Sequence, residues 1–120
     1  IYERVIFTGI TDKVQDYMQA MDVFAMPSTH EGLPLVGVEA QAAGLPCIFS
    51  DVITREMKMT ETVEFLPIDI EASTWSEHIL KLYNSSDREK GVKCIQEAGY
   101  DIKKNASKLL EFYYKVANGV

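Results

Sequence analysis

Short, mainly apolar runs alternate along the chain with segments of helical periodicity, and this alternation restricts the fold more than any other feature. The runs that predict buried strands are residues 4–7, 23–26, 46–50 and 63–66. Because such strands are apolar on both faces, both faces must be covered, as in parallel sheets flanked by helices. The sequence therefore predicts an α/β fold of the doubly wound class, with a parallel sheet of about four strands and helices on both faces.

Helical periodicity occupies the intervening segments. Apolar residues three and four positions apart predict helices over residues 12–21 and 34–43, the second starting at Pro34 and ending at Gly44. A short helical turn is expected within residues 53–59.

The last third of the chain is predicted to be helical. Two capping-box spacings, Thr74 with Glu77 and Ser86 with Glu89, predict helix starts. We expect a break at Gly99, followed by a final helix whose apolar face runs over residues 102–117.

Composition excludes several classes of protein. The chain has 120 residues, with 12 Lys and Arg against 18 Asp and Glu, giving a net charge of −6. Nucleic-acid binding relies on a basic face, so we predict no nucleic-acid partner. No run of ~18 apolar residues is present to span a membrane.

The cysteines and histidines predict neither a disulfide framework nor a metal site. Cys47 and Cys94 are too few for such a framework and are interpreted as small apolar residues in a reducing compartment. Together with His30 and His78 they do not have metal-ligand spacing. His78 is expected to face solvent.

The chain opens at Ile1, and the strand predicted at residues 4–7 follows almost at once. We therefore expect residues 1–120 to form a single partial domain of a longer protein.

Ligands of doubly wound sheets bind beyond the carboxyl ends of the strands. The segments expected there are residues 8–11, 28–33, 50–53 and 67–69. Chemistry is therefore sought in these four loops.

The loop before the second predicted helix has the composition of an anion site. Glu31 and Gly32 precede the helix, and the free N–H groups of Leu35 and Val36 point out of its first turn. Gly32 lets a ligand approach the backbone closely. Glu31 is either a ligand for sugar hydroxyls or an ordinary solvated loop acid.

Glu39 is the only charged residue in the second predicted helix, which is otherwise apolar almost all round and expected to be buried. A buried carboxylate needs a partner. Glu39 is therefore either a structural carboxylate that binds backbone N–H groups or a buried Arg, or a group that opens onto a cleft.

The motif Glu31-x7-Glu39, in the setting PS-x-x-EG-x-P-x-x-x-x-EA-x-A-x-G-x-P, resembles that of family 4 glycosyltransferases. These are retaining enzymes of the GT-B type, in which two Rossmann-like domains face each other across a cleft. The similarity extends from about Val5 to Asp51. It implies that the chain is the second half of the C-terminal, donor-binding domain, and that the first part of this domain and the N-terminal acceptor domain are absent.

The resemblance also implies roles for individual residues. Glu31 corresponds to the catalytic carboxylate, which contacts hydroxyls of the donor sugar. Glu39 corresponds to a second carboxylate, which holds the ribose hydroxyls of the nucleotide. The remaining donor-binding positions are Gly9, His30, Gly32, Leu33, Leu35 and Val36. A loop His that merely lines the cleft is the alternative for His30.

The function implied is transfer of a hexosyl group from a nucleotide diphosphate-sugar, a UDP-sugar in the first place, to a carbohydrate or lipid-linked acceptor. Bacterial surface or exopolysaccharide biosynthesis is the expected setting, and the cytoplasm or the inner face of the membrane the expected location. No metal or other cofactor is implied. The family's basic Arg and Lys pair lies upstream, so the fragment alone is expected to be inactive. The alternatives are a non-catalytic nucleotide-binding α/β module and a GT-B-type sugar-nucleotide epimerase.

Overall fold

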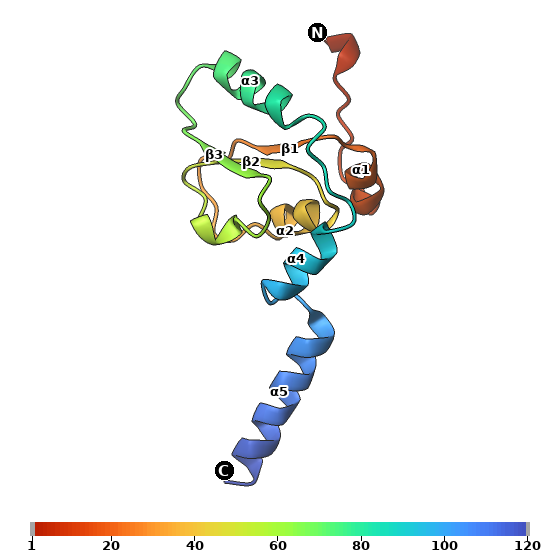
Figure 1. Cartoon of the computed structure of the whole chain (residues 1–120), viewed down its shortest axis with the longest axis vertical. Coiled ribbons are helices and arrows are strands. Elements are labelled where there is room, and N and C mark those ends of the chain that lie inside the picture. Colours follow the sequence, from red (N-terminus) through yellow and green to blue (C-terminus); the bar gives the residue numbers. More distant parts are fainter. Residues whose placement is uncertain (1, 120) are drawn as a thin grey trace.

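The computed structural model describes residues 2–119 and contains a three-stranded parallel sheet with helices on both faces (Figure 1). The strands are β1 (Phe24–Met26), β2 (Cys47–Ser50) and β3 (Val63–Leu66), hydrogen-bonded in the order β1-β2-β3. All four residues of the central strand β2 are buried. The predicted α/β class is therefore confirmed.

Five α-helices and two short 3₁₀ helices surround or extend the sheet within the described residues. They are η1 (Tyr2–Arg4), α1 (Val14–Ala20), α2 (Leu35–Ala42), η2 (Arg55–Met57), α3 (Ala72–Leu82), α4 (Gly91–Glu97) and α5 (Ile102–Ala117). Helix α3 covers one face of the sheet and α2 the other, with α4 beyond α2, while α5 projects away from the body (Figure 1). The molecule is accordingly elongated, at 62 × 28 × 27 Å.

Alternation along β2 creates two separate apolar cores. Cys47 and Phe49 are packed in the core shared with α2, whereas Ile48 is packed with Leu66 and Leu82 on the side of α3. Side chains of successive strand residues point to opposite faces, so a strand that is apolar throughout requires a helix layer on each side.

Gln41 is a fully buried polar residue that fastens α2 to the segment after η2. Its side-chain amide donates to the carbonyl oxygens of Gly37 and Met57, at 3.1 and 2.8 Å. Its carbonyl oxygen accepts from the backbone N–H groups of Met59 and Thr60, both at 3.1 Å. A buried amide is tolerated because its donors and acceptor all have partners.

Arg88 joins the carboxyl ends of α1 and α2. Its guanidinium donates to the backbone carbonyls of Met18 at 3.0 Å, Met21 at 2.6 Å and Ala43 at 2.7 Å. Carbonyls at a helix end have no intrahelical donor and carry partial negative charge, so a cation there is stabilising.

The strand predicted at residues 4–7 is wrong, and the described sheet has three strands rather than about four. Ile6 and Phe7 lie outside the regular elements, each with 86% of its surface exposed. A strand requires a hydrogen-bonded neighbour, and the only pairings in the described sheet are β1 with β2 and β2 with β3. Apolar composition alone therefore did not produce a strand here.

Both capping-box predictions are also wrong. Helix α3 starts at Ala72, with Glu71 as its N-cap, so Thr74 already lies inside the helix. Helix α4 starts at Gly91, and the Asp87 carboxylate, not Ser86, accepts a backbone hydrogen bond, from Lys90 at 3.1 Å. The expected break at Gly99 is confirmed, with φ of +99°.

Candidate functional site

The loops that leave β1 and β2 at their carboxyl ends are joined by serine side chains. The hydroxyl of Ser50, the last residue of β2, is fully buried and donates to the backbone carbonyl of Ser28. The Ser28 hydroxyl in turn donates to Glu31 Oε1 at 3.3 Å. This chain of contacts positions the half-buried carboxylate of Glu31 next to the sheet edge.

Helix α2 begins immediately after this loop. Pro34 is its N-cap rather than its first helical residue, and the first helical hydrogen bond runs from the Gly37 N–H to the Pro34 carbonyl at 2.9 Å. The N–H groups of Leu35 and Val36 therefore have no intrahelical acceptor. Together with the helix dipole they favour an anion at this position.

Gly32 leaves the space in front of this helix end open. A Cβ added at Gly32 would meet no atom within 4 Å among the described residues, and its neighbours His30 and Leu33 are exposed. The backbone here is thus accessible to a ligand.

The loop that follows residues 4–7 lies opposite α2, with a hollow between them. Gly9, at φ of +64°, and Val36 both line this hollow of about 390 Å³, together with Tyr17 and Phe24. The structure therefore brings together two of the predicted donor-binding positions that are far apart in sequence.

Glu39 is exposed, which corrects the expectation that α2 is buried almost all round. The helix buries Gly37, Val38, Ala40 and Gln41 and exposes Leu35 and Glu39. Glu39 lines a second hollow, of about 260 Å³, with Gln15, Met18 and Gln19 of α1. Of the two alternatives for Glu39, the open position is the one observed.

Met18 lines both hollows, whereas Glu31 and His30 line neither of them. Ser28 and Ser50 were missed as positioning residues, since nothing in the sequence shows that their loops touch.

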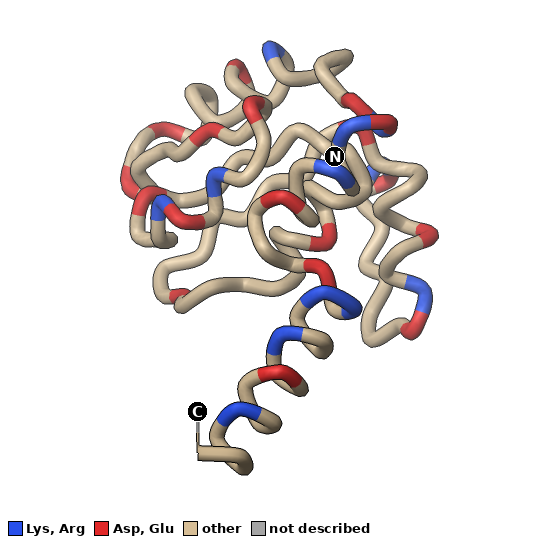
Figure 2. The backbone as a smooth tube through the Cα atoms, turned by 60° about the horizontal axis from the view of Figure 1, so that its bottom comes forward, with Lys and Arg blue, Asp and Glu red and all other residues tan. Residues whose placement is uncertain are grey.

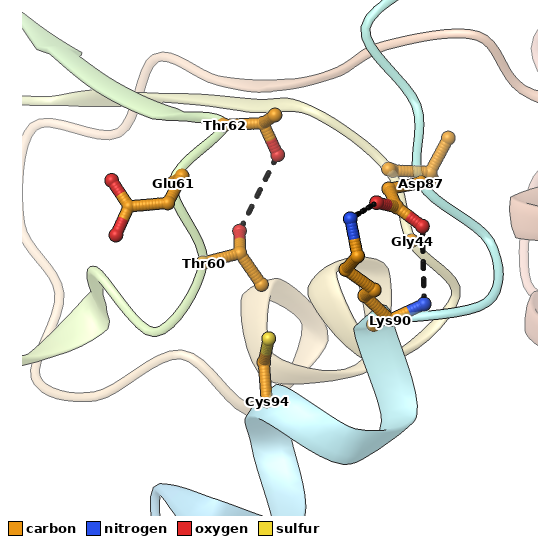
Figure 3. A pocket seen from close by; sticks show the side chains of 9 residues that line it. Gly44, Thr60, Glu61, Thr62, Asp87, Lys90 and Cys94 are labelled. Carbon is orange, nitrogen blue, oxygen red and sulfur yellow. Dashed lines mark hydrogen bonds and ion pairs between the residues drawn. The ribbon is translucent and has the colours of Figure 1, made fainter.

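A different pocket, of about 150 Å³, lies at the amino ends of β2 and β3, away from the loops described above (Figure 3). Thr60, Thr62, Lys90 and Cys94 are among its lining residues. Lys90 Nζ lies 2.9 Å from the Asp87 carboxylate and, through that hydrogen bond, holds the pKa of Asp87 below its ordinary value.

The two cysteines are expected to differ sharply in reactivity. Burial raises the pKa of the Cys47 thiol to about 12, so its reactive thiolate is scarce, whereas Cys94 is partly exposed. A thiol reagent such as dithionitrobenzoate at mildly alkaline pH should therefore modify one thiol in the folded chain and both after unfolding. Fast reaction of a folded Cys94→Ser variant would contradict this.

Two further side-chain contacts link neighbouring elements of the fold. His78 does not simply face solvent: its Nδ1 lies 2.6 Å from Glu64 Oε2, linking α3 to β3. Arg55 stacks over the Phe65 ring at 4.1 Å.

Among residues 2–119 no group of three or more His, Cys, Asp or Glu side chains is placed to hold a metal ion. No described helix is long and apolar enough to cross a membrane.

The fold and these loops define a parallel α/β domain whose candidate ligand site lies at the carboxyl ends of its strands. A family model described as "Glycosyl transferases group 1" matches residues 1–85. The chain belongs to this family. No solved structure matches.

The curated relatives are bacterial proteins named as glycosyltransferases, one of them for O-antigen biosynthesis. EpsF of Bacillus subtilis (strain 168), itself only proposed to be a glycosyltransferase, is 39% identical over 112 residues, which cover 91% of this chain and 29% of EpsF. The UDP-Gal:alpha-D-GlcNAc-diphosphoundecaprenol alpha-1,3-galactosyltransferase of Escherichia coli is 42% identical over 50 residues, or 42% of this chain and 13% of that enzyme. The O-antigen biosynthesis glycosyltransferase WclY of Escherichia coli is 38% identical over 52 residues, or 43% of this chain and 15% of that protein. The chain thus spans less than a third of these relatives.

Proposed function

We propose that the chain is the donor-binding part of a retaining family 4 glycosyltransferase of the GT-B type, in which Glu31-x7-Glu39 is the functional motif. The whole protein transfers a hexosyl group from a nucleotide diphosphate-sugar, a UDP-sugar in the first place, to a carbohydrate or lipid-linked acceptor in surface polysaccharide synthesis. The galactosyltransferase relative, whose name specifies a UDP-sugar and a diphosphoundecaprenol acceptor, supports this choice.

The observation that carries the proposal is the arrangement around the amino end of α2. Glu31 is held by Ser28 on one side, the free amides of Leu35 and Val36 face outward, and Glu39 lies exposed further along the helix. Amides at a helix end suit a diphosphate, and carboxylates accept paired hydrogen bonds from sugar hydroxyls. A nucleotide sugar presents both kinds of group.

The open edge of the sheet supports the proposal that further parts of the protein complete this domain. β1 pairs with β2 alone in the described sheet, so the backbone N–H and C=O groups along its other edge have no strand partner among the described residues. We place the missing strands of the domain, and the Arg and Lys that neutralise the diphosphate, on this side.

The test is an amide-resolved NMR titration of the chain with UDP, GDP and ADP, repeated on the full-length protein. Saturable shifts at Gly32, Leu35 and Val36, with one base preferred, are expected. No shifts in the full-length protein would exclude a donor site. Binding without transfer to any acceptor would favour the non-catalytic nucleotide-binding module, and conversion of the donor to an epimeric nucleotide sugar would favour an epimerase.

Replacement of Glu39 by alanine is expected to weaken nucleotide binding by the full-length protein about 10- to 100-fold. Hydrogen bonds to a charged group contribute about 1.5–3 kcal/mol, and the substitution removes those from the ribose hydroxyls. Calorimetric titration with the preferred nucleoside diphosphate measures the change.

Glu61→Ala is the matched control, because Glu61 is also exposed but lines the pocket at the amino ends of the strands. The control should bind the nucleotide as the unaltered protein does. Equal weakening by both substitutions would show that net charge, rather than contact with Glu39, governs binding.

A further inference from the structure

The loop between β1 and α2 carries Glu31 but has no regular backbone structure to hold it. Residues 28–33 belong to no helix or strand, and among the described residues they form no backbone–backbone hydrogen bond. The position of the Glu31 carboxylate therefore depends on contacts that side chains make with this loop.

Ser50 ties the loop to the centre of the sheet. It is the last residue of the central strand β2, is fully buried, and its hydroxyl donates to the Ser28 backbone carbonyl. The backbone of Ser50 is itself fixed, because Ser50 pairs with Leu66 of β3 and its carbonyl oxygen accepts from the Ile53 N–H at 3.1 Å. The next N–H, that of Asp51, donates to the Leu66 carbonyl at 2.9 Å. The loop is thus bonded to a rigid part of the fold.

The contact continues from Ser28 to the carboxylate. The Ser28 hydroxyl donates to Glu31 Oε1 at 3.3 Å, so two hydrogen bonds in series join β2 to Glu31. The first of these bonds starts from a side chain that is closed to solvent, where water does not compete for the donor. The free amides of Leu35 and Val36 are positioned differently, because they belong to α2 itself.

We propose that Ser50 is a positioning residue for sugar transfer, which sets the place of the Glu31 carboxylate without touching the substrate. This inference rests on the proposed function, because it takes Glu31 as the carboxylate that acts on the donor sugar. A charged group stabilises a transition state best when it is already held in place before the reaction.

The test is Ser50→Ala in the full-length protein. We expect kcat for transfer from the preferred nucleotide sugar to fall about tenfold, because a misplaced catalytic group is less effective. Affinity for the nucleoside diphosphate should stay nearly unchanged, since the α2 amides keep their place. Acidic residues are spread over the body of the chain (Figure 2), and this substitution leaves its net charge of −6 unaltered. An effect on kcat therefore reports position and not charge.

Ser85→Ala is the matched control. The half-buried Ser85 also donates its hydroxyl to a backbone carbonyl, that of Leu82 at 2.6 Å, but it lies after α3. The control should keep both kcat and nucleotide affinity. A folded Ser50→Ala variant with unchanged kcat would overturn the proposal. A loss of nucleotide affinity as large as the loss of kcat would do the same, because the whole site would then be disturbed.

The double variant Glu31→Gln with Ser50→Ala tests whether Ser50 acts through Glu31. It should be no slower than Glu31→Gln alone, since residues that act as one unit are not additive. A further tenfold loss of kcat would place the action of Ser50 elsewhere and overturn the proposal.

A measurement without nucleotide separates this inference from the proposed function. NMR order parameters of the Glu31 and Gly32 amides should fall in Ser50→Ala and not in Ser85→Ala. Unchanged order parameters would show that Ser50 does not hold the loop. If the unaltered protein transferred no sugar, the proposed function would fail, whereas the order parameters would still report whether Ser50 fixes Glu31.

Discussion

Replacing Gly91 by alanine is expected to destabilise the chain by about 3 kcal/mol. A Cβ at Gly91 would lie 2.5 Å from the Gln41 carbonyl oxygen and 2.7 Å from the Gly44 nitrogen. Both are backbone atoms, so no flexible side chain can move aside, and α4 must separate from α2. Overpacking costs typically 1–3 kcal/mol and more against rigid backbone. Urea unfolding followed by circular dichroism measures the loss.

Gly44 forms the other half of this contact. A Cβ there would lie 2.6 Å from Arg88 Cα, and its φ of +73° is strained for alanine as well. Gly44→Ala should therefore cost at least as much as Gly91→Ala.

Substitutions at two other glycines distinguish the stability cost of steric crowding from that of backbone strain. Gly32 has neither a positive φ nor a neighbour within 4 Å of an added Cβ, and Gly99, at φ of +99°, has the strain alone. Gly32→Ala should be close to neutral and Gly99→Ala should cost about 1 kcal/mol. If Gly91→Ala proved no worse than Gly32→Ala, the close packing of α4 on α2 would be wrong.

The parts of the fold that follow from local pattern were predicted from the sequence. Strands β1, β2 and β3 fall within the predicted apolar runs, and the end of α2 at Gly44, at φ of +73°, matches its predicted C-terminal glycine. These features depend on residues that are close in sequence, so the local sequence is enough to predict them.

Features that depend on contacts between distant segments were not predicted. The start of α4 depends on such a contact, because Gly91 lies against the backbone of Gln41 in α2. Close packing of this kind can outweigh a capping box worth about 1 kcal/mol. The guanidinium of Arg88 reaches carbonyls 45 to 70 residues away, which no local pattern encodes.

The residues of the candidate site likewise fall into those that the local sequence predicts and those that it does not. Glu31, Gly32 and Glu39 were selected from one continuous motif. This was possible because a loop and the helix that directly follows it are close in space as well as in sequence. Ser50 was not selected, since its role depends on β1 and β2 being neighbours in the sheet. Gly9 was selected only from the resemblance to a family, and its position across a hollow from Val36 was not predicted.

Glu31→Gln in the full-length protein is expected to lower kcat for sugar transfer by about 10²- to 10³-fold while leaving nucleotide affinity nearly unchanged. In glycosyl transfer the sugar ring gains positive charge at the transition state, so a carboxylate near the reacting carbon binds that state more strongly than the ground state. Losing one preorganised electrostatic contact costs about 2.7–4 kcal/mol of barrier. Steady-state transfer from the preferred nucleotide sugar measures kcat, and calorimetry measures the affinity.

The comparison with Glu39→Gln makes this assignment specific. Both variants are isosteric and remove one negative charge, but Glu31 is half-buried against Ser28 and Glu39 is exposed beside α1. Glu31→Gln should act on kcat, and Glu39→Gln on nucleotide affinity and KM. Ser28→Ala, which frees the Glu31 carboxylate without changing its charge, should lower kcat less than Glu31→Gln. A Glu31→Gln variant that keeps full kcat would exclude Glu31 as the catalytic carboxylate.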